Sequence, residues 1–363
     1  MTFPKLLLAV LTSLVLAACG GSNDDTAADK PTAKPASTEP GLGAIKGYLL
    51  DHSRALVAST SEMEAQGKAY YALAQSVDFD YDRLLAERRD ETRTQVERLQ
   101  ATWRKANPEY EEMEGVVAGV PELSEFDVII DAGSDASDPE SAVPFDVKVP
   151  DGPTLEKPGN FFFLTETSLF GTNKAFQAKG TTPDLDGDGK VAFGEAVPDA
   201  RYVLAFTRDF AAQARKLDAA SKAWTPERAD AFQALVTMTP TMSEYFGQWK
   251  TSRFVAGSKA KEASFAGASR LQDIEDILSG LVLIYDNVQP AVAEADPAQA
   301  EQTGRDLKRL LAFAVDLHDR EERGTKFDAE QADTLGAQAQ GQAEAIAGQV
   351  SQAAGQLGIE LES

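Results

Sequence analysis

The sequence predicts an all-α protein, made of helical bundles that pack as two antiparallel sets. Three observations support this prediction. Apolar residues recur at spacings of three and four along most of residues 42–357, which is the pattern of amphipathic helices. Helix starts are recognisable, with a capping Thr225 or Asp328 followed by acidic residues. Finally, helical patterns lie on both sides of one irregular stretch at 119–160, which suggests two bundle halves.

The N-terminus is interpreted as a bacterial lipoprotein signal peptide, not as part of the fold. Residues 1–18 hold one early positive charge and an apolar stretch too short to span a bilayer. They end in Leu-Ala-Ala before Cys19, the only cysteine, which a lipobox would acylate. An ordinary signal peptide is the alternative. With 19–41 as a flexible polar linker, we expect a protein anchored to the membrane by lipid, facing the periplasm or the exterior.

Composition excludes several classes of function. A formal net charge of −23 argues against nucleic acid as a partner. With Cys19 lipidated, no cysteine remains for a disulfide, a thiolate metal site or a nucleophile. The chain has only two histidines, which excludes a metal site made of histidines alone.

Residues 42–363 are expected to form the helical domain. The first helix is expected over 42–77 and the second from 81 to about 105, with a restart near Pro108 that continues to Pro121. Residues 119–160 are rich in Pro, Gly, Asp and Ser and are expected to be irregular, apart from a short hairpin pairing 145–149 with 154–155. Further helices are expected near 161–170, 199–221, 225–251, 259–290, 297–322 and 328–357.

The stretch DLDGDGKVAFGE, residues 184–195, matches the EF-hand calcium loop. Acidic residues stand at positions 1, 3, 5 and 12, and Gly189 stands where the loop turns sharply. Pro183 precludes an entering helix, and no second loop accompanies this one. We therefore expect a structural Ca²⁺ site that fixes the following helix, not a sensor. The predicted ligands are Asp184, Asp186, Asp188, the backbone carbonyl of Lys190, and Glu195.

A second group of carboxylates points to another metal. Glu111 and Glu114 are three residues apart, on one face of a helix, with Tyr110 beside them. Glu166 stands alone in the apolar stretch FFFLTETSLFG, where a carboxylate is costly without a metal, an arginine or a hydrogen bond. A solvated Glu111 and an arginine-paired Glu166 are equally consistent with the spacing.

These segments resemble the imelysin-like proteins, which include the EfeO and EfeM iron-uptake components. That family pairs a Y-E-x-x-E segment with a later G-x-H-x-x-E segment. Residues 110–114 match the first, and 161–171 resemble the second with Glu166 as its glutamate. The resemblance extends through Asp273 and Asp276 to the C-terminus. It implies an all-helical pair of bundles with a metal held between them.

One departure from the family pattern changes the expected ligand set. The motif histidine falls on Phe163, so the remaining ligands are all oxygens, which suit hard ions such as Fe³⁺ or Ca²⁺ better than Zn²⁺. A literal His-x-x-Glu occurs instead at His318 and Glu321, where a histidine on a charged helix face is the more ordinary interpretation.

The favoured function is a cell-envelope lipoprotein that binds a metal ion, with iron as cargo, a structural Ca²⁺, and an iron permease or peroxidase as partner. The alternative is a structural or interaction lipoprotein stabilised by calcium alone. A metallopeptidase is less favoured, because the chain has no H-E-x-x-H, no G-x-S-x-G and no usable cysteine.

Overall fold

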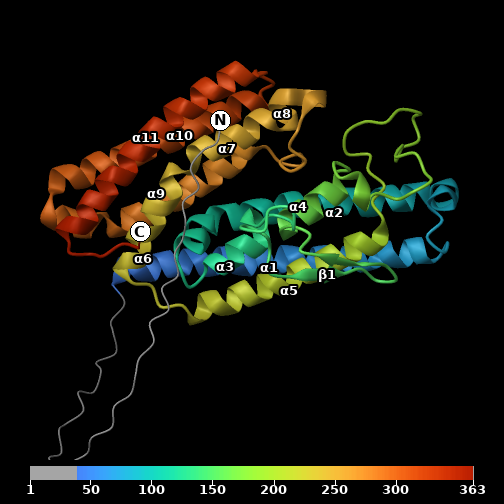
Figure 1. Cartoon of the computed structure of the whole chain (residues 1–363), viewed down its shortest axis with the longest axis horizontal. Helices are drawn as coiled ribbons and strands as arrows, with labels where there is room; N and C mark the ends of the chain where they lie inside the picture. Colours follow the sequence, from blue (N-terminus) through green and yellow to red (C-terminus); the bar gives the residue numbers. More distant parts are fainter. Residues whose placement is uncertain (1–38, 363) are drawn as a thin grey trace, which may run out of the picture. The chain divides into compact units, whose positions relative to one another are not determined.

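Two groups of helices organise residues 39–362, the part of the chain that this computed structural model describes (Figure 1). The predicted signal peptide, Cys19 and the linker before residue 39 lie outside the described residues. Within 39–362, no helix combines the length and the apolar character needed to cross a membrane. The all-α prediction is confirmed, since β-structure in this part is limited to one two-stranded hairpin and isolated bridges.

In the first group, α1 packs along both α2 and α5, and the short α4 packs against α2 and α5. Leu49, Leu56 and Met63 follow one face of α1 at helical spacing and are fully buried. Asp80, Asn160 and Asp199 cap the starts of α2, α4 and α5 by accepting a backbone N–H. These helices are α1 (Pro40–Gln75), α2 (Tyr81–Gly119), α4 (Phe161–Leu169) and α5 (Ala200–Ala223).

In the second group, α9 packs on α10, and α11 packs on α7, α6 and α10. The groups meet where α9 packs against α2, and one connected apolar core runs through both. Figure 1 shows most of the second group, in orange and red, above the blue to yellow-green helices of the first group, with α6 beside one end of α1. Its helices are α6 (Arg228–Met238), α7 (Met242–Thr251), α8 (Arg253–Ala256), α9 (Arg270–Ala295), α10 (Pro297–Glu322) and α11 (Ala329–Gln356).

The stretch from 119 to 160 is more ordered than the sequence indicated. It begins with a short helix α3 (Ser124–Asp127) that runs directly into a π-helix, η1 (Val128–Ala132). The predicted hairpin is present, with β1 (Asp146–Lys148) antiparallel to β2 (Thr154–Glu156) and Val147 opposite Leu155. π-Helical turns are rare, and those that occur are often found at functional sites. This one carries the carboxylate of Asp131.

Four predicted helix boundaries were wrong. Helix α2 runs without a break through Pro108, because buried residues on both sides of the proline, such as Trp103 and Tyr110, hold the helix in place. The one residue of α2 with non-helical backbone angles is Arg88. The helix expected over 225–251 is divided by a 3-10 turn, Thr239–Thr241, that contains a proline.

The first helix in this region also starts later than expected. Glu227 caps α6 in place of Thr225, forming a capping box with Asp230, whereas Asp328 caps α11 as predicted. Likewise, the helix expected to begin at 259 begins at Arg270. The preceding residues form short 3-10 turns and bends, and Phe265 there has φ of +53°, which a helix cannot contain.

Candidate metal centre

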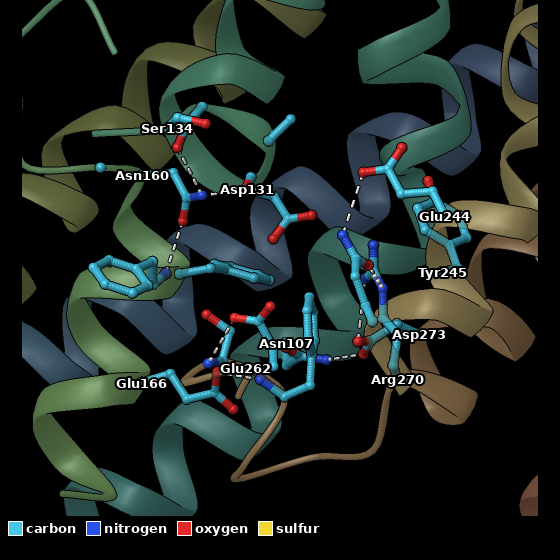
Figure 2. Close-up of a pocket in the computed structure, with 18 of the residues that line it drawn as sticks. Asn107, Asp131, Ser134, Asn160, Glu166, Glu244, Tyr245, Glu262, Arg270 and Asp273 are labelled. Atoms are coloured by element: carbon cyan, nitrogen blue, oxygen red, sulfur yellow. Dashed lines mark hydrogen bonds and ion pairs between the residues drawn. The ribbon is translucent and has the colours of Figure 1, made fainter. Parts of the chain in front are cut away.

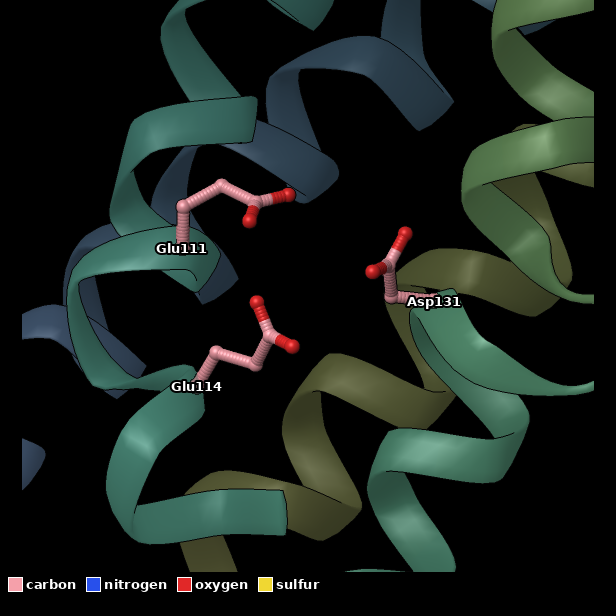
Figure 3. A group of neighbouring side chains, drawn as sticks. All are labelled: Glu111, Glu114 and Asp131. Atoms are coloured by element: carbon pink, nitrogen blue, oxygen red, sulfur yellow. The ribbon is translucent and has the colours of Figure 1, made fainter. Parts of the chain in front are cut away.

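Three carboxylates from separate stretches of the chain converge between the two helix groups. Glu111 and Glu114 project from one face of α2, and Asp131 projects from η1 toward them (Figure 3). One oxygen of each lies within 4.8 Å of an oxygen of the other two. Glu111 and Glu114 are only 1% and 3% exposed. We call these three residues the acidic cluster.

Glu114 is the member of the cluster with a buried, unpaired oxygen among the described residues. The Tyr245 hydroxyl donates a hydrogen bond to its Oε1 at 3.0 Å. Its Oε2 is buried and has no hydrogen-bond partner among the described residues. Burial, together with the neighbouring Asp127 and Asp131, raises the pKa of Glu114 to about 8. A buried oxygen without a partner is costly, and a cation between the three carboxylates would remove that cost.

The backbone around Asp131 is fixed by the start of the next helix. Asn160 donates from Nδ2 to the carbonyl oxygens of Asp131 and Gly133, the latter at 3.0 Å. Its Oδ1 accepts the Phe163 backbone N–H at 2.7 Å, which caps α4. Burial raises the pKa of Asp131 to about 6, and Arg270 opposes that rise. The π-turn and the cap therefore act together to aim Asp131 at Glu111 and Glu114.

Arg270 is a built-in positive charge beside the cluster. It is 2% exposed and donates from Nη1 to Asp273 Oδ2 at 3.2 Å and to Glu111 Oε2 at 3.5 Å. Its guanidinium carbon lies 4.2 Å from the Tyr245 ring centre and 4.5 Å from that of Phe265. Burial alone would lower the pKa of Arg270, but Glu111 and Asp273 hold that pKa well above its usual value. Arg270 thus compensates part of the buried negative charge.

Tyr110, proposed as part of the site, contacts a carboxylate that the sequence analysis did not single out. Its hydroxyl donates to Asp127 Oδ1 at 2.7 Å. Burial, followed by Asp131, raises the pKa of Asp127 to about 7, while the Tyr110 hydrogen bond opposes the rise. Asp127 lies one helical turn before Asp131, so it adds negative charge behind the cluster.

A cavity of about 410 Å³ opens onto the cluster (Figure 2). Glu114, Asp131 and Arg270 form part of its inner wall, and Trp103, Phe162 and Phe163 give it an aromatic side. Further carboxylates of the lining belong to Asp135, Asp138, Glu166, Glu244, Glu262 and Asp273. One water takes about 30 Å³ in the liquid, so the cavity has room for several waters. A cation can therefore arrive with its hydration shell.

Glu166 does not join the acidic cluster, in contrast to the expectation from the family motif. Its two oxygens accept the backbone N–H groups of Phe265, Ala266 and Gly267 at 2.8, 2.9 and 2.9 Å. Burial raises the pKa of Glu166 to about 8, and these three amides act in the opposite direction. The partners of the Glu166 carboxylate are therefore backbone amides. Of the three partners expected from the sequence, a metal, an arginine or a hydrogen bond, the hydrogen bond is the one observed.

The other expected ligands lie at the edge of the site or away from it. Asp273 accepts from Asn107 Nδ2 at 2.7 Å and pairs with Arg270, so it borders the cavity without converging on the cluster. His318 contacts Glu275 at 2.8 Å, and Glu321 accepts the Trp249 indole N–H at 2.8 Å. The His-x-x-Glu pair is therefore engaged elsewhere, because each side chain has its own partner on a neighbouring helix.

The Asp-rich loop at 184–195 turns tightly around its own carboxylates. Asp184 accepts the amides of Gly187 and Gly189 at 2.9 and 3.2 Å. Gly189 has φ of +82°, a conformation that side chains disfavour, as the motif requires. Oxygens of Asp184, Asp186 and Asp188 lie within 4.8 Å of one another. Glu195 Oε2 meanwhile accepts the Ala192 amide at 2.5 Å. No helix leads into the loop, in agreement with the reasoning from Pro183.

The sequence analysis missed Asp127, Asp131 and Arg270. A usable signal was present in FDVIIDAG, where two aspartates four residues apart enclose three apolar residues. The same reasoning that drew attention to Glu166, an acid in an apolar stretch, applies to Asp131. It was not applied because the surrounding segment was interpreted as an irregular loop.

The family model described as Imelysin, Peptidase_M75, matches residues 44–352, which include both helix groups, the acidic cluster and the Asp-rich loop. A comparison with curated proteins found none that matches this chain.

Proposed function

Because the chain belongs to the imelysin family, we propose that it is a cell-envelope lipoprotein that captures a hard metal cation, with iron as the favoured cargo. One observation carries the proposal: Glu114, whose buried Oε2 has no hydrogen-bond partner among the described residues, lies beside the carboxylates of Glu111 and Asp131. A group of acids on a surface would be unremarkable. A buried group with an open acceptor needs a cation, or protons, to be stable.

The donor set fits a hard ion. Oxygens bound to one ion at about 2.0–2.6 Å can lie up to about 5 Å apart across it, which matches the 4.8 Å limit of the cluster. Carboxylates alone favour Fe³⁺, Mn²⁺ or Ca²⁺ over Zn²⁺, which prefers nitrogen and sulfur. Phe163 occupies the position of the motif histidine and lines the cavity, so the cluster supplies no nitrogen ligand there.

The Asp-rich loop is proposed to hold Ca²⁺ as a structural ion. Three aspartate oxygens already lie within 4.8 Å of one another, and Asp184 also anchors the loop, since Arg89 donates to its carbonyl oxygen. Gln100 Nε2 donates to the Gly194 carbonyl at 2.8 Å, which attaches the far end of the loop to α2. A structural ion would need this kind of attachment to stabilise the surrounding fold.

Membrane anchoring through Cys19 and delivery of iron to a permease or peroxidase complete the proposal. They are supported by the lipobox pattern and the polar linker of the sequence. Metabolic labelling with a palmitate analogue tests the anchor: label should appear on the wild-type chain and be absent from Cys19→Ser.

We do not propose peptide hydrolysis, despite the peptidase name of the family. Of the two histidines, His52 contacts Glu109 and His318 contacts Glu275. Neither lines the cavity. Casein or peptide cleavage that is abolished by Glu114→Gln would overturn this view.

Elemental analysis of protein purified without chelators tests the main proposal. We expect iron or manganese to be retained by the wild type and lost in Glu114→Gln. The matched control is Glu109→Gln on the same helix, whose carboxylate contacts His52 and does not line the cavity; it should retain the metal. Calcium alone, unchanged in Glu114→Gln, would favour the alternative of a calcium-stabilised structural or interaction lipoprotein.

A further inference from the structure

Residues 262–267 form a short non-helical segment, here called the strap, that crosses the cavity before α9 begins. At its centre, Phe265 has φ of +53°, a strained conformation for a residue with a side chain. Such strain persists only where surrounding contacts impose it. Here the contacts come from Glu166, which accepts the backbone N–H groups of Phe265, Ala266 and Gly267.

The opposite edge of the strap is held by two arginines. Arg253 Nη1 donates to the Ala266 carbonyl at 3.1 Å, and Arg104 Nε donates to the Gly267 carbonyl at 3.0 Å. The peptide groups of the strap are thus fixed by an acid on one side and by cations on the other. The strap also passes so close to Phe170 that only glycine fits at position 267, since a Cβ there would lie 2.4 Å from a ring carbon of Phe170.

The strap in turn places an aromatic ring on the guanidinium of Arg270. Phe265 lies on one side, 4.5 Å from the guanidinium carbon to the ring centre, and Tyr245 contributes the other ring at 4.2 Å. Held there, Arg270 donates hydrogen bonds to Glu111 and Asp273, whereas Glu114 and Asp131 receive none from it among the described residues and sense its charge only at longer range. The strap therefore decides which carboxylates Arg270 neutralises and which remain for a cation.

Arg253 connects the strap to the Asp-rich loop. The guanidinium carbon of Arg253 lies 3.6 Å from the ring centre of Phe193, which belongs to the loop. Phe193 also stacks on Phe170 with ring centres 6.0 Å apart. Phe193 is 45% exposed, so these ring contacts lie at the surface of the loop. These contacts link the loop, Arg253 and the strap in sequence.

We propose that Glu166, Arg253 and Phe193 are positioning residues of the acidic cluster: they hold the strap, and through it Arg270, so that order in the Asp-rich loop raises the cation affinity of the cluster. This inference rests on the proposed function for its effect on binding. The geometry of the strap itself can be tested independently of any cation at the cluster. Reciprocity requires that a cation at the cluster also strengthen Ca²⁺ binding at the loop.

The first experiment is hydrogen exchange of the backbone amides of residues 265–267 in the full chain. Adding Ca²⁺ should slow exchange in the wild type, and this protection should be lost in Phe193→Ala. Phe193→Tyr keeps the ring over Arg253 and should restore protection. Val191→Ala is the control, since Val191 is 60% exposed on the same loop and makes no such ring contact. Exchange that is identical in all four proteins would overturn the proposal.

The second experiment measures Mn²⁺ affinity of the cluster, defined as the binding that Glu114→Gln abolishes. Ca²⁺ at a concentration that fills the loop and leaves the cluster to Mn²⁺ should raise this affinity by about tenfold in the wild type, a typical coupling between sites, and by less than about twofold in Phe193→Ala. Glu166→Gln should weaken it about tenfold, because its amide N–H₂ would oppose the Phe265 N–H. If Glu166→Gln fails to fold, the Phe193 variants, which change an exposed side chain, still decide the matter.

The two readouts separate the two proposals. If the wild type shows no Mn²⁺ binding that depends on Glu114, the proposed function fails while the exchange data still test the strap. If Mn²⁺ binds but responds to neither Ca²⁺ nor Phe193→Ala, the positioning role is overturned and the proposed function stands.

Discussion

The acidic cluster and the Asp-rich loop each bring three carboxylates within 4.8 Å, yet they are built in opposite ways. The loop takes all three from five consecutive residues, and its own amides satisfy them at the surface. The cluster takes its three from α2 and η1, buries the two glutamates, and leaves one oxygen without a partner among the described residues. Local sequence can therefore specify the first site, whereas only the completed fold creates the second.

This difference also predicts different dependence on ions. Without a cation, the loop remains hydrated and its amides still bond the aspartates. The cluster has few amides of its own to satisfy its carboxylates, so without a cation it must hold protons or rely on Arg270. The following predictions contrast the two sites, from the largest expected effect to the smallest.

Removing Arg270 should have the largest effect. Arg270→Met leaves Glu111 and Asp273 buried without their cation, and we expect a loss of about 3–5 kcal/mol in the free energy of unfolding at neutral pH. Urea denaturation measures it. Arg93→Met is the control on the exposed face of α2, where the pair with Glu97 should contribute at most about 1 kcal/mol. Similar losses in the two variants would contradict the role of Arg270.

The cation-free protein should lose stability as the pH rises. A carboxyl whose pKa goes from 4.5 to about 8 on folding, as for Glu114, binds more protons in the folded state. Its stabilising contribution is complete below about pH 4.5 and is lost as the pH passes through about 8. We expect a loss on the order of a few kcal/mol between pH 5 and 9, measured by urea denaturation in EDTA.

Glu114→Gln provides the internal check on that pH dependence. The amide has nearly the same shape and no titrating proton, so the slope between pH 5 and 9 should decrease. At pH 9 the variant should be more stable than the wild type. Asp186 in the loop behaves oppositely, since an amide hydrogen bond lowers its pKa, so Asp186→Asn should leave the slope unchanged. An unaltered slope in Glu114→Gln would assign the effect to other carboxyls.

Disrupting the loop should remove the stabilisation that Ca²⁺ provides. In the wild type, Ca²⁺ at about 100 times its dissociation constant should add about 2.7 kcal/mol to the free energy of unfolding. Asp184→Ala should abolish the corresponding rise in Tm, because Asp184 both faces the ion position and accepts two loop amides. Glu301→Ala, an exposed acid of α10 paired with Arg305, should retain the rise. Equal shifts in both variants would place the calcium effect outside the loop.

Lys190→Ala should have the smallest effect. Position 7 of a calcium loop supplies a backbone carbonyl, which this substitution keeps. We expect Ca²⁺ affinity to change by less than about twofold, in contrast to Asp188→Ala, which removes a side-chain ligand. Isothermal titration calorimetry of the two variants gives the comparison. A large loss in Lys190→Ala would show that the side chain itself participates.

The sequence revealed most of the fold but only part of the buried site. Helical periodicity and caps such as Asp328 located the long helices, because these signals act over a few residues. Glu111 and Glu114 were found because residues three apart share a helix face. Asp131 was missed because its place depends on a π-turn and on Asn160, contacts that local pattern does not encode.

The error over 259–290 has a similar physical origin. The stretch KEASFAGASR contains several good helix formers, so propensity favoured a helix. Glu166, about a hundred residues earlier in the chain, instead takes the amides of residues 265–267 that a helix would have used. Glu166 was recognised as unusual from sequence, but whether a buried acid meets a metal or a backbone segment depends on tertiary structure.

Helix α2 gives the two sites a fixed separation. Its Arg89 donates to the carbonyl of Asp184 in the loop, and the same helix carries Glu114 in the cluster, 25 residues farther on. At 1.5 Å per residue, Arg89 and Glu114 lie about 37 Å apart along one continuous helix, with Gln100, which holds the far end of the loop, between them; the single non-helical residue, Arg88, precedes all three. The helix thus fixes the distance between these two positions, and paramagnetic ions or spin labels placed beside Arg89 and Glu114 should report one narrow distance.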